Sequence, residues 1–187
     1  GDTPMTATGL EEATGVRSVV AGDFNNDGFP DLCVLTDSGT LLYANANGAF
    51  QRSDVTLPPG AFNAAAWLDY DHDYDVDLVL VGERSVLLRN NGAAGFSDQS
   101  TDFPFAAEPA LSAQVIDVLP DTSGRDLFVT YANRTGVLYK DMLAGTFEAR
   151  DVDQAAPGSR ALAVADLNAD SATDLILGAG STVTALF

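Results

Sequence analysis

The sequence predicts an all-β fold, a β-propeller made of four-stranded antiparallel blades, on three observations. First, an acidic loop between two apolar runs occurs four times, and the loops begin at Asp23, Asp69, Asp117 and Asp166, at intervals of 46, 48 and 49 residues. Second, each loop is followed by further strand-like segments that are separated by turn signals. Third, none of the repeats carries a helical stripe longer than a turn or two. Four short strands per repeat of this length are typical of a propeller blade.

The first repeat unit contains the four expected strands in order. Apolar and β-branched residues favour one strand before the acidic loop and one after it, and two more strand-like segments follow. Hairpin turns are indicated between the segments and in later units, at Ser38-Gly39, Asn47-Gly48, Asn91-Gly92 and Gly145. The expected strands of the first unit are residues 17–24, 31–36, 40–45 and 50–56.

Counting the blades predicts how the chain closes. A single domain of residues 1–187 is divided into repeat units over residues 16–62, 63–110, 111–158 and 159–187. The last unit ends with its third strand, whereas the fourth strands of the others begin with the aromatic residues Phe50, Phe96 and Phe147. We expect residues 2–8 to supply the missing strand and to close a ring of four blades, because closure removes free sheet edges. The alternative is a fragment of a larger propeller.

The first acidic loop has the chemistry of a calcium site. Oxygen-bearing side chains occupy positions 1, 3, 5 and 9 of the stretch from Asp23 to Asp31, and Gly28 stands at position 6. Calcium takes roughly six to eight oxygen ligands, and glycine permits the left-handed conformation that a tight loop needs. The flanking runs are short and apolar, without the helices of an EF-hand. The loop is therefore predicted to join two strands.

The repeated pattern also carries a family resemblance. Asp-x-Asp/Asn-x-Asp-Gly-x-x-Asp-Leu between two apolar strands resembles the FG-GAP and VCBS repeats of integrin α-chain-type propellers, over essentially the whole chain. The resemblance implies a propeller whose strand-connecting loops bind calcium. In the first loop it implies ligation by the side chains of Asp23, Asn25, Asp27 and Asp31, with the carbonyl of Phe29 as a fifth ligand.

The other loops match this pattern to different extents. The matching residues of the second loop are Asp69, Asp71, Asp73 and Asp77, with Asp75 as an additional charge and Tyr74 in place of glycine. Those of the fourth loop are Asp166, Asn168, Asp170, Asp174 and the carbonyl of Ala172, with Ser171 in place of glycine. The third loop, Asp117 to Asp126, has lost one ligand, so we expect it to be empty. About three calcium ions are thus expected; the alternative is that the loops are solvated hairpins without an ion.

Composition limits the partners. The chain has 27 acidic and 9 basic residues and a net charge of −18, which argues against nucleic acid or an anionic membrane as a partner. No apolar run approaches the roughly 18 residues that a membrane-spanning helix needs, so no membrane insertion is expected. Cys33 lies in an apolar run and is interpreted as a buried hydrophobic residue. His72, the only histidine, is expected to point to solvent.

The motifs favour binding over catalysis. We expect a non-enzymatic binding, adhesion or scaffold module with structural calcium, because the sequence has no nucleophile elbow, phosphate loop, zinc signature or dinucleotide fingerprint. Weak calcium sites are typical of extracellular modules, which predicts an extracellular, periplasmic or cell-surface setting. A protein or glycan ligand is expected on the face opposite the calcium loops, near Phe103, Phe105 and Arg160 in the links between blades. The same aromatic residues could instead seal the gaps between blades.

Two alternatives stay open for the role of the chain. It could be the scaffold or accessory domain of a secreted carbohydrate-active or lyase-type enzyme, because propellers host many chemistries. It is also expected to be part of a longer multidomain chain, since similar repeats often accompany other domains.

Overall fold

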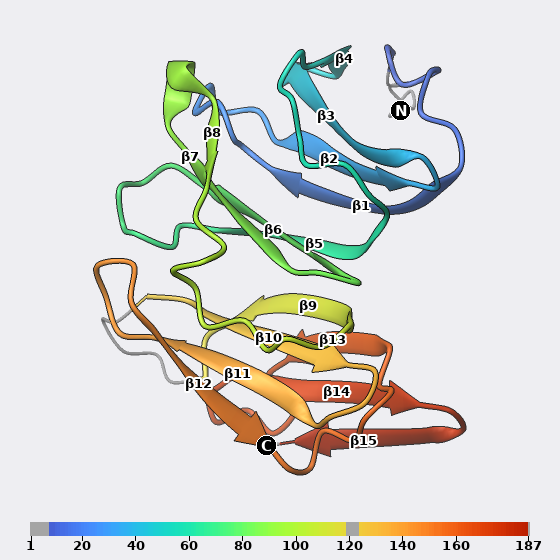
Figure 1. Cartoon of the computed structure of the whole chain (residues 1–187), viewed down its shortest axis with the longest axis vertical. Coiled ribbons are helices and arrows are strands. Elements are labelled where there is room, and N and C mark those ends of the chain that lie inside the picture. The colour runs from blue at the N-terminus through green and yellow to red at the C-terminus, as the bar shows by residue number, and fades with distance from the viewer. Residues whose placement is uncertain (1–7, 119–123, 187) are drawn as a thin grey trace.

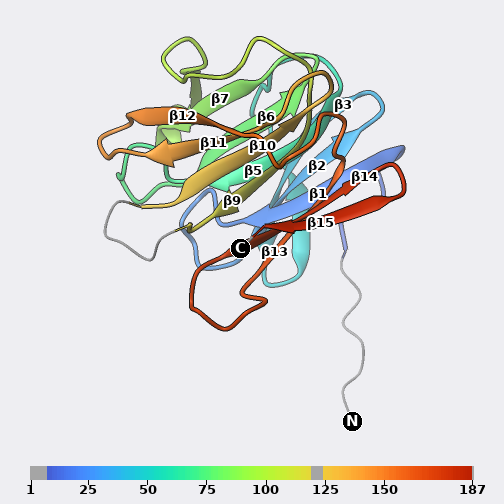
Figure 2. The same ribbon diagram turned by 90° about the horizontal axis from the view of Figure 1, so that it is seen from below.

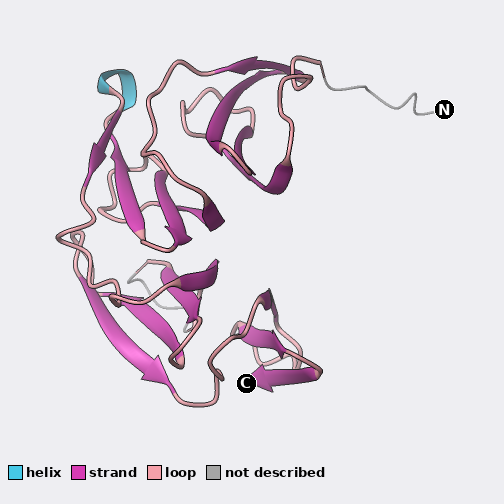
Figure 3. Ribbon diagram, turned by 45° about the vertical axis from the view of Figure 1, so that its right-hand side comes forward, coloured by secondary structure: helices cyan, strands magenta, loops and turns pink. Residues whose placement is uncertain are grey.

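The four acidic repeats fold into four antiparallel sheets, which follow one another around a common centre as the blades of a β-propeller (Figure 1, Figure 3). The computed structural model describes residues 8–118 and 124–186. Within these residues the helical structure is limited to one short 3-10 turn, η1 (Gly92–Ala94). None of their helical segments is long and apolar enough to cross a membrane. The predicted all-β propeller fold is confirmed.

Strands pair in chain order within each blade. The first blade consists of β1 (Val16–Gly22), β2 (Asp31–Thr36), β3 (Gly39–Ala46) and β4 (Ala49–Arg52). The second consists of β5 (Phe62–Leu68), β6 (Asp77–Gly82), β7 (Val86–Asn90) and β8 (Phe96–Asp98). The third consists of β9 (Ala110–Ile116), β10 (Asp126–Tyr131), β11 (Gly136–Asp141) and β12 (Phe147–Val152). The fourth consists of β13 (Ala161–Ala165), β14 (Asp174–Ala179) and β15 (Thr182–Leu186).

The second strand of each blade forms the middle of the core. Successive side chains of a strand point to opposite faces of its sheet. In β6, Leu78 and Leu80 therefore pack toward the first blade, in the same cluster as Cys33. Val79 and Val81 point the other way, toward the third blade. The apolar run of β6 thus fills the interfaces on both sides of the second blade.

Cys33 fits this arrangement as a core residue. Its side chain is fully buried and forms no disulfide. Burial raises the pKa of the thiol to about 12, so the thiolate is not populated at neutral pH. The interpretation of Cys33 as a small buried hydrophobic residue is confirmed.

The two ends of the strands define two faces of the propeller. Figure 2 shows the acidic loops at one end of the strands and the turns between second and third strands at the other end. Because the strands are antiparallel, the links between blades lie on the same face as those turns. The acidic loops are therefore separated from the inter-blade links by the length of the blades.

Neighbouring blades contact one another through their innermost strands. β1 packs on β5, β5 on β9, and β9 on β13, whereas no contact of that extent joins β1 and β13 within the described residues. The strand predicted to complete the last blade, residues 2–8, lies outside the described residues except for Thr8. The carbonyl of Thr8 accepts a hydrogen bond from the N–H of Phe50 (2.8 Å), and Thr8 pairs in parallel with Ala49. This residue therefore lies on the first blade.

The aromatic residues between the second and third blades belong to the core. Phe103 is only 6% exposed, and its ring centre lies 4.9 Å from that of Phe147 and 5.2 Å from that of Tyr139. Phe105 is half-buried and packs 4.3 Å from Phe103. Of the two interpretations of these rings, an exposed ligand surface or a seal between blades, the structure supports the seal. Arg160 is exposed.

Candidate metal centre

The first, second and fourth acidic loops share one backbone conformation. At position 6 the φ angle is +89° in Gly28, +72° in Tyr74 and +72° in Ser171. Position 4 is also left-handed in each of the three loops, at Asn26, His72 and Ala169. Side chains with a Cβ are disfavoured in this region by about 1–2 kcal/mol. The loop shape is thus kept even where the glycine is lost.

The first aspartate of each loop closes the turn. In the first loop, Asp23 accepts the N–H of Asp27 at Oδ1 (3.1 Å) and that of Gly28 at Oδ2 (2.8 Å). Asp69 accepts the equivalent bonds from Asp73 (3.1 Å) and Tyr74 (3.2 Å). In the fourth loop, Asp166 accepts them from Asp170 (3.2 Å) and Ser171 (3.0 Å). The repeated aspartates therefore explain why three different sequences adopt the same turn.

The last aspartate of each loop is buried at the start of the second strand. Asp77 Oδ2 accepts the N–H of Tyr70 (2.8 Å), while its Oδ1 accepts the N–H of Asn90 at the end of β7 (2.8 Å). Asp31 makes the same two bonds, with Phe24 (3.0 Å) and Asn45 (2.8 Å). Both Asp31 and Asp77 have no exposed surface. Each carboxylate clamps the acidic loop to the third strand of its own blade, a role that spacing alone did not predict.

Burial makes these clamp carboxylates unusually basic. It raises the pKa of Asp77 to about 7, although the N–H groups of Tyr70 and Asn90 favour the charged form, and the nearby Asp71 and Asp73 raise it further. The pKa of Asp31 is likewise raised, first by burial. A cation placed beside Asp77 would favour the charged form and so lower its pKa.

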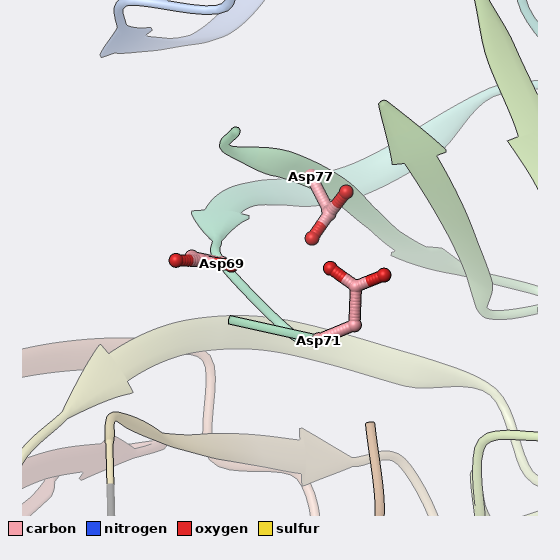
Figure 4. A group of neighbouring side chains, drawn as sticks. All are labelled: Asp69, Asp71 and Asp77. Atoms are coloured by element: carbon pink, nitrogen blue, oxygen red, sulfur yellow. The ribbon is translucent and has the colours of Figure 1, made fainter. Parts of the chain in front are cut away.

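Three carboxylates of the second loop converge. Asp69, Asp71 and Asp77 offer oxygen atoms that all lie within 4.8 Å of one another, and Figure 4 shows the carboxylates of Asp71 and Asp77 facing each other. Asp71 Oδ1 is buried and has no hydrogen-bond partner. Burial raises the pKa of Asp71, and the charge of Asp73 raises it further. Oxygen donors, crowded charge and an unpaired buried oxygen fit a hard cation such as calcium.

The second loop also contains an internal counter-charge. Arg89, on β7, lies with Nε 2.7 Å from Asp71 Oδ2 and with Nη2 3.0 Å from Asp73 Oδ2. Its side chain is 37% exposed. Sequence reasoning missed Arg89 because it lies outside the acidic pattern. The signal that could have found it is the pairing of β6 with β7, which places it beside the loop.

The remaining predicted ligands are arranged differently. Asp73 pairs with Arg89, and Asp75 accepts a hydrogen bond from Asn26 of the first loop; neither joins the group of three carboxylates. In the first loop, Asn25 Nδ2 donates to Asp27 Oδ2 (3.0 Å) and the N–H of Phe29 donates to Asp27 Oδ1 (2.9 Å).

The fourth loop repeats the bonding of the first. Asn168 Nδ2 donates to Asp170 Oδ2 (3.0 Å), and the N–H of Ala172 donates to Asp170 Oδ1 (2.8 Å). Asp174 Oδ2 accepts the N–H of Leu167 (2.7 Å), which is half of the clamp made by Asp77. The predicted ligands of the first and fourth loops are thus held in matching positions by their own turns.

The third loop lies partly outside the described residues, and so does the prediction that it holds no metal. Its last aspartate, Asp126, accepts the N–H of Asp141 (2.9 Å) and a backbone hydrogen bond from Val118, and so repeats the clamp. Oδ2 of the buried Asp141 lies 2.8 Å from His72 Nε2 of the second loop. The expectation that His72 points to solvent is therefore wrong, because its ring links the second and third blades.

Comparison with known proteins agrees with this reading of the loops. Residues 23–80, which include the first two acidic loops, match the FG-GAP-like repeat. Curated protein sequences give no match. The fold resembles a solved structure whose title describes specific recognition of non-reducing terminal N-acetylglucosamine by an Agrocybe aegerita lectin, with a TM-score of 0.63 and 16% sequence identity. The similarity covers 92% of this chain and 49% of that one, so this chain spans about half its length. The chain is thus a four-bladed β-propeller whose residues 23–80 match the FG-GAP-like repeat.

Proposed function

We propose that this propeller is a non-enzymatic binding module whose acidic loops are stabilised by calcium. The observation that carries the proposal is the convergence of Asp69, Asp71 and Asp77 around the unpaired, buried Asp71 Oδ1. Such a group of carboxylates repels itself, and Arg89 offsets only part of the repulsion through Asp71. Calcium would supply the remaining positive charge.

Side chains of the chain itself would hold the ion. Asp69 follows β5 and Asp77 opens β6, so an ion bound by both would join the ends of two strands. The first and fourth loops offer the equivalent residues, led by Asp23 and Asp166. Weak structural calcium sites suit an extracellular, periplasmic or cell-surface environment, where calcium is abundant.

Thermal unfolding tests the calcium proposal directly. In millimolar calcium we expect a melting temperature roughly 5–10 °C above that in excess chelator, because a ligand at about 100 times its Kd stabilises by about 2.7 kcal/mol. Asp71→Asn should reduce the shift, whereas the exposed Asp153→Asn should not. An equal midpoint with calcium and with chelator would refute calcium binding and leave the fold unaffected.

The ligand proposed for the module is a glycan or a protein surface on the face opposite the acidic loops. A groove of about 480 Å³ lies there, beside the link from β4 to β5, and is lined by Thr40, Arg52, Ser53, Asp54 and Thr56, among others. Hydroxyl, carboxylate and guanidinium groups suit the hydrogen bonds of a sugar. The lectin title of the structural neighbour supports a glycan as the first ligand to test.

Binding to immobilised glycans, including terminal N-acetylglucosamine, tests the ligand class. Arg52→Ala and Asp54→Ala should weaken glycan binding, while the exposed Asp153→Asn on the third blade should leave it unchanged. Absence of glycan binding would move the proposal to a protein ligand. Turnover of any bound glycan would overturn the non-enzymatic assignment.

A further inference from the structure

The turn between the second and third strands is longer in the third blade than in the other three. It consists of residues 132–135, between β10 and β11, whereas the equivalent turns consist of residues 37–38, 83–85 and 180–181. The longer turn contains the triplet Asn133-Arg134-Thr135. Like the other turns of this kind, it lies on the face opposite the acidic loops (Figure 2). The additional residues thus carry a motif that the strand pattern itself does not need.

The triplet has the acceptor pattern for an N-linked glycan. That pattern is asparagine, any residue except proline, and then serine or threonine. Asn133 is the only asparagine of the sequence that has serine or threonine two positions later. Asn47 and Asn91 also stand in turns of the propeller, but each is followed by Gly-Ala. The sequence therefore offers a single acceptor.

Hydrogen bonds fix both ends of this turn. The N–H of Ala132 donates to the carbonyl of Pro109 (2.9 Å), in the link that enters the third blade. At the other end, the N–H of Gly136 donates to the carbonyl of Ala155 (2.9 Å), in the link that leaves it. The triplet is thus presented between two inter-blade links and takes no part in either bond.

The middle residue of the triplet is anchored, whereas its two neighbours are not. Arg134 lies over the ring of Tyr131, with Cζ 5.7 Å from the ring centre, and donates to Asp151 of β12. Asn133 is exposed, and Thr135 is partly exposed. Neither side chain makes a hydrogen bond to any residue that the structure describes. The amide of Asn133 therefore has room for a bulky substituent that displaces no contact of the fold.

We propose that Asn133 carries an N-linked glycan. This inference rests on the extracellular setting proposed for the module, because the sugar is transferred in the secretory pathway from a lipid-linked oligosaccharide diphosphate. Nδ2 of Asn133 forms a bond to the anomeric carbon of the oligosaccharide and gives one proton to a base of the transferase. The bond from that carbon to the diphosphate breaks, and the lipid diphosphate leaves with the electron pair. The hydroxyl of Thr135 completes the sequence that the transferase recognises.

A glycan at this turn would leave the candidate metal centre uncovered. The turn and the acidic loops lie at opposite ends of the strands, so the sugar and the group of Asp69, Asp71 and Asp77 occupy different faces. Glycosylation and calcium binding are therefore expected to be independent, which allows one to be tested without the other.

Expression of the full chain behind a secretory signal in cultured animal cells tests the site. Peptide N-glycosidase should lower the mass of the protein and, in heavy-oxygen water, should leave one heavy oxygen at Asn133 as its amide becomes a carboxylate. Asn133→Gln and Thr135→Ala should each abolish the change in mass, whereas Thr135→Ser should retain it. Asn47→Gln, at another exposed turn asparagine, is the matched control and should also retain it. Protein from cells and from medium is measured, so that poor secretion cannot hide the result.

Thermal unfolding of the same samples separates this inference from the calcium proposal. Removal of the glycan should change neither the melting temperature nor its shift with calcium. Wild-type protein without a glycan, or a glycan that persists in Asn133→Gln, would overturn the inference and leave the calcium proposal intact. A melting temperature that rises when the glycan is removed would show that the folded turn does not accommodate it. A glycosylated chain whose melting temperature ignores calcium would refute the calcium proposal alone.

Discussion

The first and second acidic loops have one backbone conformation and two ways of balancing charge. In the first, Gly28 takes the left-handed position, and Ala44 lies beside the loop on the third strand. In the second, Tyr74 takes that position with a similar φ angle, and Arg89 stands where the first blade has Ala44. The second loop also has the buried oxygen without a partner, Asp71 Oδ1.

This difference separates what shapes the loop from what controls its charge. The turn is made by the first aspartate and the clamp by the last, and both are present in each loop. Glycine and the number of additional carboxylates do not change the shape of the loop. The presence of glycine sets how much backbone strain the loop carries. The number of carboxylates sets how strongly the loop attracts a cation.

Removing the clamp should have the largest effect, and it should be similar in both loops. Asp77→Ala and Asp31→Ala should each lower the free energy of unfolding by about 3 kcal/mol, because two N–H groups lose their acceptor. Urea unfolding would measure this. Asp75→Ala is the control inside the loop and should cost less than about 0.5 kcal/mol. Equal losses for Asp75→Ala and Asp77→Ala would show that the clamp is not the stabilising element.

The free energy of unfolding should depend on pH through the buried carboxyl group of Asp77. The pKa of Asp77 is about 7 in the folded chain against an ordinary value of 3.8, so the folded state binds this proton more tightly than the unfolded state. In chelator, the contribution of this group to the free energy of unfolding should be fully present below pH 3.8 and should disappear as pH rises to about 7. Unfolding free energies measured from pH 4 to 8 should show a shallower decline in Asp77→Asn. An unchanged pH dependence in that variant would contradict the assignment to Asp77.

Exchanging residues at position 6 should have a smaller effect, with opposite signs in the two loops. Tyr74 is 89% exposed, so Tyr74→Gly loses little packing and should stabilise by about 1 kcal/mol by relieving the left-handed strain. Gly28→Ala should destabilise by a similar amount, about 1 kcal/mol. Thermal unfolding of both variants in chelator would measure the two effects. Destabilisation by Tyr74→Gly would mean that the Tyr74 side chain has a role beyond its backbone.

Removing the internal counter-charge should give the smallest change in stability. Arg89→Ala should cost less than about 1 kcal/mol in chelator, because the ion pairs are partly exposed. Calorimetric titration should show tighter calcium binding in this variant, since Asp71 and Asp73 are freed from the guanidinium. Arg150→Ala, which breaks an exposed pair with Glu148 on the third blade, should leave calcium affinity unchanged. Weaker binding after Arg89→Ala would mean that Arg89 supports the site.

The sequence predicted the local features of the fold well. The strand after each loop begins at the expected aspartate, as at Asp31 and Asp77, because Asp-Leu followed by an apolar run is a local signal. Contacts between distant segments could not be read from it. The pairing of Arg89 with Asp71, the bond from His72 to Asp141 and the burial of Phe103 all depend on strand register or on the packing of one blade against the next.

Two hydrogen bonds join the first acidic loop to the second blade. Asn90 Nδ2, in the second blade, donates to the carbonyl of Phe24 (2.7 Å), and Asn26 Nδ2 donates to Asp75 of the second loop. Ordering one loop therefore lowers the entropy that the other loses when it becomes ordered. If both loops bind calcium as proposed, their occupancies are linked by a reciprocal coupling free energy, and binding curves fitted with independent sites would misstate both affinities.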